Sequence, residues 1–303
     1  MSTDPITPDS QHRKAALGLP ERLRDYALLA RWDRPIGWWL LYWPCVFGVV
    51  LTGAPLSLQW PLLLWLLLGA VAMRGAGCVY NDIVDADLDK SVARTASRPI
   101  ASGRVSKRAA WIWLNAQCLV GLVVLLQLRW EAQLVALGSL ALVAAYPFMK
   151  RITWWPQLWL GLVFNWGALV GWLALRDDRI EVMAALYAGA MLWCVGYDTI
   201  YALQDKEDDA LVGIRSSARR LDGSVRAGVA GFYIAAIACW ALAFYLLRLD
   251  WMALLALVPI ALHLGWQVIT LEPEDGENAL ARFRSNRMAG LLIAAACFVV
   301  GNA

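Results

Sequence analysis

Charge is scarce in this sequence: Asp, Glu, Lys and Arg make up 17% of the 303 residues, whereas hydrophobic residues make up 60%. Mean hydropathy is +0.53. This composition excludes an ordinary soluble domain and is typical of integral membrane proteins. The net charge of +3 is small, so the distribution of the charges carries more information than their sum.

Histidine is also rare, and the cysteines stand in unreactive surroundings. With only His12 and His263, a zinc or haem site has few ligands available. All the cysteines lie within or at the ends of apolar segments, where a disulfide framework is not expected. We interpret them as small buried side chains: Cys45, Cys78, Cys118, Cys194, Cys239 and Cys297.

The first 34 residues lack the apolar stretch of a cleavable signal peptide. The second half of this polar segment places Leu23, Tyr26, Ala27 and Ala30 on one side of a helix. This pattern predicts an amphipathic helix that lies on the membrane surface. The alternative interpretation is a solvated leader.

Long apolar segments dominate the rest of the chain. A helix needs about 20 mostly apolar residues to cross a bilayer, and nine segments qualify. Since no linker separates them, the sequence predicts an all-α integral membrane protein, with a polar segment 1–34 followed by one domain, 35–303. The predicted spans lie near 36–53, 58–80, 109–128, 130–147, 154–175, 180–203, 226–248, 251–269 and 287–302.

The basic residues are distributed unevenly between the two sides of the membrane. When the N-terminus is placed inside, Arg129, Arg176, Arg179 and Arg248 fall outside, Arg74 lies within a span, and all other Lys and Arg residues fall inside. By the positive-inside rule, this bias predicts a cytoplasmic N-terminus and a C-terminus on the opposite side. The acidic loops are then cytoplasmic too, and we expect the membrane to be a bacterial inner membrane.

The stretch after the second predicted span, NDIVDADLDKSVARTASRPIASGRVSKR, is dense in charge. On a helix Asn81, Asp85 and Asp89 are four residues apart and share one face. A second pair with this spacing, Asp205 and Asp209, follows the sixth predicted span. Oxygen ligands of this kind select Mg²⁺, which is commonly completed by substrate phosphates. The two motifs therefore predict a magnesium site.

Basic residues accompany both acidic motifs. Arg can clamp phosphate oxygens with two hydrogen bonds, and Lys acts on them as a point charge. For any single loop charge, solvation and topology are the alternative explanation, but the repeated spacing of the acids favours a metal and diphosphate site. The predicted phosphate ligands are Arg94, Arg98, Lys150 and Arg151.

Three further side chains stand out by position. Arg74 lies inside the second predicted span, where a charge needs an anionic partner or must reach the headgroups. Asp198 precedes Asp205 by seven residues on the same helical face. Tyr146 precedes Lys150 by four residues, so its ring could stabilise a cation beside a leaving diphosphate or pack on a neighbouring helix.

Four segments of the sequence resemble a known family, the membrane-embedded aromatic prenyltransferases of the UbiA superfamily. They are RWDRPIGWWLLYWP, NDIVDADLDKSVARTASRPIASG, YPFMKRITWWPQLWLGLVFNWGALVGW and GYDTIYALQDKEDDALVGIRSSA. The resemblance covers nearly the whole chain beyond about Leu23 and is strongest to the branch that acts on 4-hydroxybenzoate in ubiquinone synthesis. It implies a nine-helix bundle around a cavity open to lipid, capped by the two acidic loops.

The resemblance also implies an activity, the transfer of a polyprenyl group from polyprenyl diphosphate to the ring carbon ortho to the acceptor hydroxyl. It implies a Mg²⁺ site at Asn81, Asp85, Asp205 and Asp209, with Asp82 and Asp89 in the same motif. It implies diphosphate contacts for Arg94, Lys150 and Arg151. The implied catalytic residues are Asp198, Tyr146 and Lys150, with Asp198 near the acceptor, and the candidates for binding the acceptor carboxylate are Arg74 and Arg34.

Two alternatives remain open at this point. The first is a prenyltransferase of the same superfamily with another acceptor, such as haem, a naphthoate or a chlorophyllide. The second is an ion-coupled transporter. Transport predicts acidic residues near the bilayer midplane between broken helices, whereas the acids of this sequence fall at helix ends.

Overall fold

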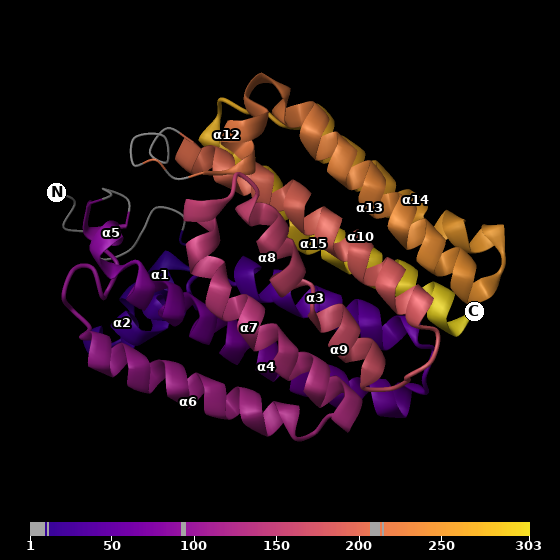
Figure 1. Cartoon of the computed structure of the whole chain (residues 1–303), viewed down its shortest axis with the longest axis horizontal. Helices are drawn as coiled ribbons and strands as arrows, with labels where there is room; N and C mark the ends of the chain where they lie inside the picture. The colour runs from indigo at the N-terminus through magenta and orange to yellow at the C-terminus, as the bar shows by residue number, and fades with distance from the viewer. Residues whose placement is uncertain (1–9, 11, 92–94, 207–212, 214) are drawn as a thin grey trace. The chain divides into compact units, whose positions relative to one another are not determined.

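The structure is a computed structural model that describes residues 10, 12–91, 95–206, 213 and 215–303 (Figure 1). The described residues form helices and turns, with no strand among them. The chain divides into two compact units. Unit 1 consists of Met1–Trp39 and Trp65–Gln127, and unit 2 consists of Leu40–Leu64 and Leu128–Ala303.

Unit 1 contains the N-terminal helices and the first acidic motif. Its helices are α1 (Arg13–Leu17), α2 (Glu21–Leu29), the start of α3 (Ile36–Leu51), most of α4 (Leu56–Val84), α5 (Ala86–Ser91) and α6 (Lys107–Leu125). Ser106 caps the N-terminus of α6, since its side chain accepts a hydrogen bond from the backbone N–H of Ala109. The core includes Leu29 of α2 and Val79 of α4, both fully buried.

The C-terminal part of α2 packs on the core of unit 1. Leu29 and Ala30 are buried, as are Ala27 and Leu28, and the Tyr26 ring meets the Trp113 ring edge-on at 5.7 Å. Leu23 is 60% exposed. The predicted apolar side is therefore part of the core of unit 1 near the C-terminal end of α2. A position of this helix on the membrane surface stays a prediction.

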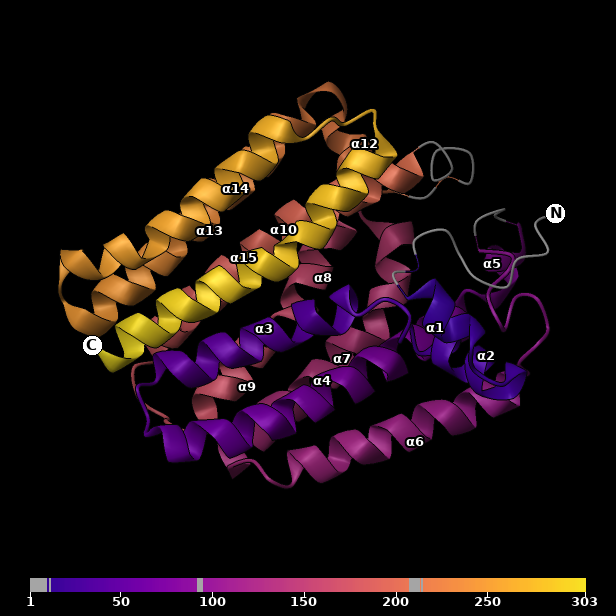
Figure 2. The same ribbon diagram turned by 180° about the vertical axis from the view of Figure 1, so that it is seen from behind.

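Unit 2 contains the remaining helices. They are α7 (Trp130–Ile152), α8 (Pro156–Phe164), α9 (Gly167–Leu173), α10 (Ile180–Tyr201), η1 (Ala202–Asp205), α12 (Ser217–Leu221), η2 (Asp222–Ser224), α13 (Val225–Arg248), η3 (Trp251–Leu257), α14 (Val258–Thr270) and α15 (Gly276–Asn302). α13 and α14 run side by side in both views (Figures 1 and 2). The core contains large aromatic side chains, including Trp193 and Trp240, both fully buried.

Seven helical stretches of the described chain are long and apolar enough to cross a membrane. They confirm seven of the nine predicted spans as apolar helices. The first predicted span is the shorter helix α3. The fifth is broken into α8 and α9 at Asn165, whose buried side chain donates a hydrogen bond to the carbonyl of Gly161 at 2.9 Å.

Small residues allow α3 and α9 of unit 2 to approach closely. A methyl group added at Gly171 would collide with the backbone carbonyl of Cys45, and one added at Gly48 would collide with the carbonyl of Ala168. Such contacts bring the two backbones together in the way that small residues do in membrane helices. The short helix α9 is therefore fixed against α3.

Candidate active site

The first acidic motif lies where α4 ends and α5 begins. Asp85 is a bend between the two helices, yet the helical hydrogen bonds continue through it: the Asp85 N–H donates to Asn81 O at 2.9 Å, and the Asp89 N–H donates to Asp85 O at 2.8 Å. Asn81, Asp85 and Asp89 therefore follow one another at one-turn intervals, as predicted. Asp82, Asp85 and Asp89 are all buried, with 1%, 1% and 6% of their surface exposed.

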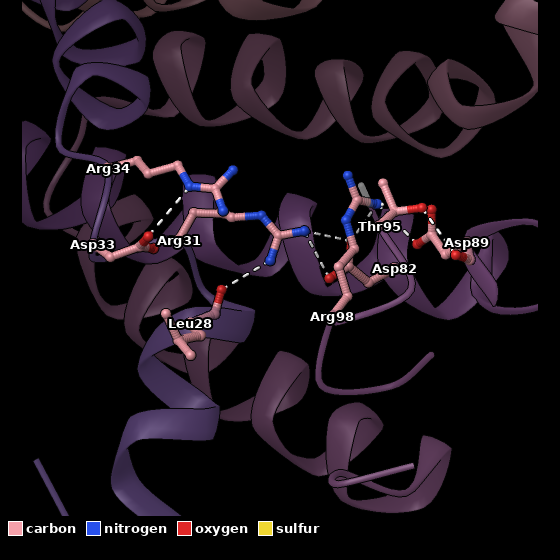
Figure 3. A network of polar contacts seen from close by, with 8 residues as sticks. All are labelled: Leu28, Arg31, Asp33, Arg34, Asp82, Asp89, Thr95 and Arg98. Carbon is pink, nitrogen blue, oxygen red and sulfur yellow. Dashed lines mark hydrogen bonds and ion pairs between the residues drawn. The ribbon is translucent and has the colours of Figure 1, made fainter. Parts of the chain in front are cut away.

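Two arginines hold two of these carboxylates (Figure 3). Nη2 of Arg31 donates to both oxygens of Asp82, at 2.7 and 2.8 Å, while its Nη1 donates to the carbonyl of Leu28 at 2.8 Å. Nη1 of Arg98 donates to both oxygens of Asp89, at 3.0 and 2.8 Å, and to Asp82 at 3.2 Å. The two ion pairs are thus linked through Asp82.

The electrostatics of this network follow from its burial. Burial lowers the pKa of Arg31, but the charge of Asp82 more than offsets this, and the pKa is raised above its ordinary value. Burial raises the pKa of Asp89, against the opposing effect of Arg98. Arg31 also has a φ of 59°, in the left-handed region that side chains other than glycine rarely adopt.

Arginines bind Asp82 and Asp89 in the first motif. Asn81 and Asp85 carry an amide and a carboxylate oxygen one turn apart. Among the described residues, no group of three or more His, Cys, Asp or Glu side chains could hold a metal ion. Asn81 and Asp85 provide oxygen ligands of the kind that Mg²⁺ requires. They are two of the four residues of the predicted magnesium site.

Several predicted residues have no described side chain. Asp209 and Arg94 lie outside the described residues, and only the backbone of Asp205 and Lys150 is described. The first acidic motif belongs to unit 1 and the second to unit 2. The two halves of the predicted site therefore belong to different units.

The two candidates for the acceptor carboxylate, Arg34 before α3 and Arg74 in α4, approach each other in unit 1 near the start of α3. Nε of Arg34 donates to Asp33 at 3.3 Å. The guanidinium of Arg74, from α4, lies against Gly37, where an added methyl group would come within 2.7 Å of Nε. The Gly37 N–H in turn donates to the carbonyl of Arg34, so the structure places Arg74 within one turn of Arg34.

In unit 2, the end of α10 carries the other catalytic candidates. Asp198 is partly exposed, and Tyr201, the last residue of α10, contacts the Phe283 ring with centroids 4.6 Å apart. Tyr146 is partly buried in α7, and Arg151 is exposed near the end of that helix.

Arginines that the sequence reasoning missed surround the end of α7. Nη1 of Arg215 donates to the carbonyl of Ile152 at 2.7 Å, and its guanidinium lies over the Trp154 ring at 5.7 Å. Arg219 lies over the same ring at 5.4 Å. Together with Arg151 these residues form a basic cluster beside the chain that follows α10.

Buried hydrogen bonds fix the start of α12 in this region. The Ser217 N–H donates to Oε1 of Gln157 at 2.9 Å, and the hydroxyls of Ser217 and Thr199 are 2.7 Å apart. α8, α10 and α12 are thereby tied together. These hydrogen bonds hold α12, which carries Arg219 of the basic cluster, in place.

Arg31 is the other residue that the sequence reasoning missed, since it was counted only among the topology-setting charges. The available signal was its position, in a short RWDR string of mixed charge directly before the first span. A buried charge just before a membrane span needs a partner of opposite charge. The acidic residues after the second span are the nearest carboxylates in the sequence that could provide it.

Comparison with known proteins shows what the chain is similar to. The model of the UbiA prenyltransferase family matches residues 41–295. The mitochondrial 4-hydroxybenzoate polyprenyltransferase of Arabidopsis thaliana is 43% identical over 91% of this chain and 69% of its own length. The proteins of the same name from Bos taurus and Homo sapiens are 43% and 40% identical, over 90% and 95% of this chain and 74% and 80% of their own lengths.

Solved structures give the same fold. The apo structure of a UbiA homolog from Aeropyrum pernix K1 superposes with a TM-score of 0.72 at 26% identity, over 86% of this chain and 97% of that one. A UbiA homolog from Archaeoglobus fulgidus, bound to GPP and Mg²⁺, gives a TM-score of 0.64 at 18% identity, over 92% of this chain and 100% of that one.

The comparisons correct one expectation from the sequence. The relatives at 40–43% identity are mitochondrial proteins of a plant and two mammals. The prediction of a bacterial inner membrane is therefore wrong, because charge bias identifies the side of a membrane on which a loop lies and carries no information about which membrane it is.

Proposed function

We propose a function that follows from one fact: this chain belongs to the UbiA prenyltransferase family. It transfers a polyprenyl group from polyprenyl diphosphate to the ring carbon ortho to the hydroxyl of 4-hydroxybenzoate, a step of ubiquinone synthesis. The observation that carries this function is the identity of 40–43%, over at least 90% of the chain, to 4-hydroxybenzoate polyprenyltransferases.

For the membrane architecture, we propose nine crossings. Seven are the long apolar stretches, one is α3, and one is the broken pair α8 and α9. This arrangement places both acidic motifs on the same side of the membrane, which a shared metal requires. It also favours the transferase over the transporter, because Asp82, Asp85 and Asp89 lie where α4 ends and α5 begins.

Asn81 and Asp85 would hold Mg²⁺ from the first motif, and Asp205 and Asp209 from the second. When bound, the metal neutralises charge on the diphosphate leaving group. Solved relatives bound to Mg²⁺ and to Cd²⁺ accord with a divalent cation in this fold. Asp82 and Asp89 act on the site through Arg98, which they hold in place.

Basic residues near both acidic motifs bind the diphosphate of the prenyl donor. Their charge stabilises the oxygens as the allylic C–O bond breaks and its electron pair leaves with the diphosphate. A guanidinium held by buried carboxylates, as Arg98 is by Asp89, loses little further conformational entropy when it binds. The proposed ligands are Arg94, Arg98, Lys150 and Arg151, joined by Arg215 and Arg219.

The acceptor reacts at the ring carbon beside its hydroxyl. That carbon bonds to the allylic carbon, for which Tyr146 provides an aromatic face. The ring carbon then loses its proton, and Asp198 accepts it as general base. Arg74 and Arg34 bind the carboxylate at the other end of the acceptor, which fixes the ring orientation and hence the position of transfer.

The test uses the purified full-length protein in detergent with 4-hydroxybenzoate, Mg²⁺ and a series of prenyl diphosphates, with the product identified by mass spectrometry and NMR. We expect 3-polyprenyl-4-hydroxybenzoate and loss of turnover on chelation. A product with another acceptor but none with 4-hydroxybenzoate would overturn the acceptor assignment. If no acceptor receives a prenyl group, the assignment of prenyltransferase activity is wrong.

Asp85→Asn and Asp205→Asn test the metal assignment. Each removes one charge with little change in volume, and we expect turnover to fall by at least about a hundredfold. The matched control is Asp87→Asn, because the Asp87 side chain is 82% exposed and pairs with Lys90 and Lys107. Full magnesium-dependent activity in both site variants would remove these residues from the site.

A further inference from the structure

Arg282 of α15 lies over the ring of an aromatic side chain of α14. Its guanidinium carbon is 4.2 Å from the centroid of the Trp266 ring, well within the range of a cation–π contact. Trp266 is four residues from the end of α14 at Thr270, and Arg282 is six residues from the start of α15 at Gly276. The pair therefore lies about 6–9 Å below the connection between the two helices.

This guanidinium has no anionic partner in the part of the chain that the structure describes. No carboxylate of that part lies within 4.0 Å of it, and its Nε is buried without a hydrogen-bond partner. The acids of the neighbouring connection are engaged elsewhere or exposed: Glu274 pairs with Lys206 at 3.8 Å, and Asp275 accepts from the first N–H groups of α15. A cation so placed in a membrane protein requires an anion.

Arg282 and the residues that follow it in α15 divide their contacts between α14 and α10. The neighbouring Phe283 contacts Tyr201 of α10, and Asn286 accepts a hydrogen bond from Nε1 of Trp193, also in α10, at 2.8 Å. Arg282 and Ser285 instead face α14. The Arg282 guanidinium thus contacts α14, and none of the contacts described for it involves a residue of the proposed chemistry.

Beyond Arg282, the surface of α14 is one that lipid covers. Leu262, Trp266 and Ile269 follow one another at helical spacing and are 70%, 41% and 79% exposed. Such a stripe on a membrane helix faces hydrocarbon. Trp266 therefore has one face toward Arg282 and an edge toward the acyl chains, the position of an interfacial tryptophan.

A buried polar chain holds this pair in register. The Tyr233 hydroxyl donates to Oε1 of Gln267 at 2.7 Å, and Nε2 of Gln267 donates to the Ser285 hydroxyl at 2.8 Å. His263 lies 3.3 Å from the same Gln267 nitrogen. α13, α14 and α15 are thereby fixed to one another (Figure 2), so Trp266 is a preorganised platform for Arg282.

We propose that Arg282 and Trp266 bind the phosphate of an anionic phospholipid at the membrane interface between α14 and α15. The guanidinium donates to the phosphate oxygens, Trp266 lies beside the glycerol backbone, and the acyl chains run along Leu262 and Ile269. Basic sites between membrane helices recognise headgroups in this way. The site is separate from the prenyl transfer and does not depend on it.

The test measures lipid binding to the purified full-length protein. Native mass spectrometry from delipidated detergent solution, with added phosphatidylglycerol or phosphatidylcholine, counts bound lipids, and inorganic phosphate serves as the headgroup-free arm. We expect one site that prefers phosphatidylglycerol, raises Tm when filled, and does not respond to inorganic phosphate. Arg282→Gln weakens that site by about tenfold, and Trp266→Leu weakens it while keeping the charge.

Arg287→Gln is the matched control, since it removes the same charge from an exposed position on the same helix. The Tm of each variant without lipid shows whether it is folded. Equal loss of lipid in Arg282→Gln and Arg287→Gln, both folded, would show attraction to general surface charge and overturn the site. Saturation by inorganic phosphate, or equal affinity for phosphatidylcholine, would overturn the choice of an anionic lipid.

Discussion

Arg31 and Asp82 form a buried ion pair that joins the N-terminal segment to the first acidic motif of unit 1, with N–O distances of 2.7 and 2.8 Å. A second ion pair, Arg104 with Asp25 at 2.9 Å, joins α2 to the chain before α6. Between them lies the cluster of buried apolar residues around Leu29. The end of the N-terminal segment thus holds the first acidic motif in place, and we call this set of contacts the brace.

Arg31→Ala tests this brace. It leaves the Asp82 carboxylate buried with only Arg98 beside it, at 3.2 Å, and breaking one side of a buried pair costs about 3 kcal/mol. We expect the free energy of unfolding to fall by that amount, measured by denaturant titration in detergent. The control Lys90→Ala breaks an exposed pair, 58% and 82% exposed, and should cost less than about 1 kcal/mol.

A double variant separates pairing from packing. Arg31→Met with Asp82→Leu replaces the ion pair by apolar groups, an exchange that is commonly neutral. We expect it to recover most of the stability lost in Arg31→Ala. If the double variant is as unstable as the single one, the ion pair is not the source of the stability.

The helices were predictable because long apolar runs have few solutions in a membrane. The predicted span at 130–147 became α7 and that at 226–248 became α13, within a few residues. The break between α8 and α9 was not predictable, since it depends on the buried amide of Asn165 bonding to Gly161, which hydropathy does not register. The start of α15 at Gly276 was missed because its first three turns carry charged residues.

The acidic residues were found by their spacing, but spacing does not divide them by role. Asn81, Asp82, Asp85 and Asp89 are equally plausible oxygen ligands in the sequence. Only the three-dimensional contacts show that Asp82 and Asp89 are bound by arginines. The partner Arg31 is 51 positions away from Asp82 along the chain, a distance at which no local pattern operates.

Gly37→Ala probes the acceptor site without removing a charge. The added methyl group would lie 2.7 Å from Nε of Arg74, so the guanidinium must move. On the proposed function, the KM for 4-hydroxybenzoate rises about tenfold, a loss of roughly 1.4 kcal/mol, while the KM for the prenyl diphosphate is unchanged. Steady-state kinetics with each substrate varied in turn give both values.

The control for this experiment lies on α4 itself. Gly77→Ala meets nothing within 4 Å and should leave both KM values unchanged, with a gain in helix stability of up to about 1 kcal/mol. Arg74→Gln should raise the acceptor KM further than Gly37→Ala does. An unchanged acceptor KM in Arg74→Gln would exclude Arg74 from carboxylate binding.

Gly171→Ala tests the close packing of α9 on α3. The added methyl group collides with the carbonyl of Cys45 and lies 3.2 Å from the Val49 nitrogen, and backbone atoms cannot move aside as side chains do. We expect a loss of about 2 kcal/mol and a lower Tm. Gly231→Ala on α13 meets nothing within 4 Å and should not lower Tm; equal effects would show that this packing is unimportant.

The proposed nine crossings can be tested through the side on which two loops lie. If α8 and α9 together cross the membrane, the loop with Asp87 and the loop with Asp222 lie on the same side. If they do not, the path of the chain is reversed from α10 onward, and Asp222 lies on the opposite side. Asp87→Cys and Asp222→Cys, both exposed, should therefore react with a membrane-impermeant maleimide added to the same side of sealed vesicles. Cys45, Cys78, Cys194 and Cys297 are buried, whereas Cys118 and Cys239 are partly exposed, so both variants also carry Cys118→Ser and Cys239→Ser. Labelling of the two variants from opposite sides would contradict the proposal of nine crossings.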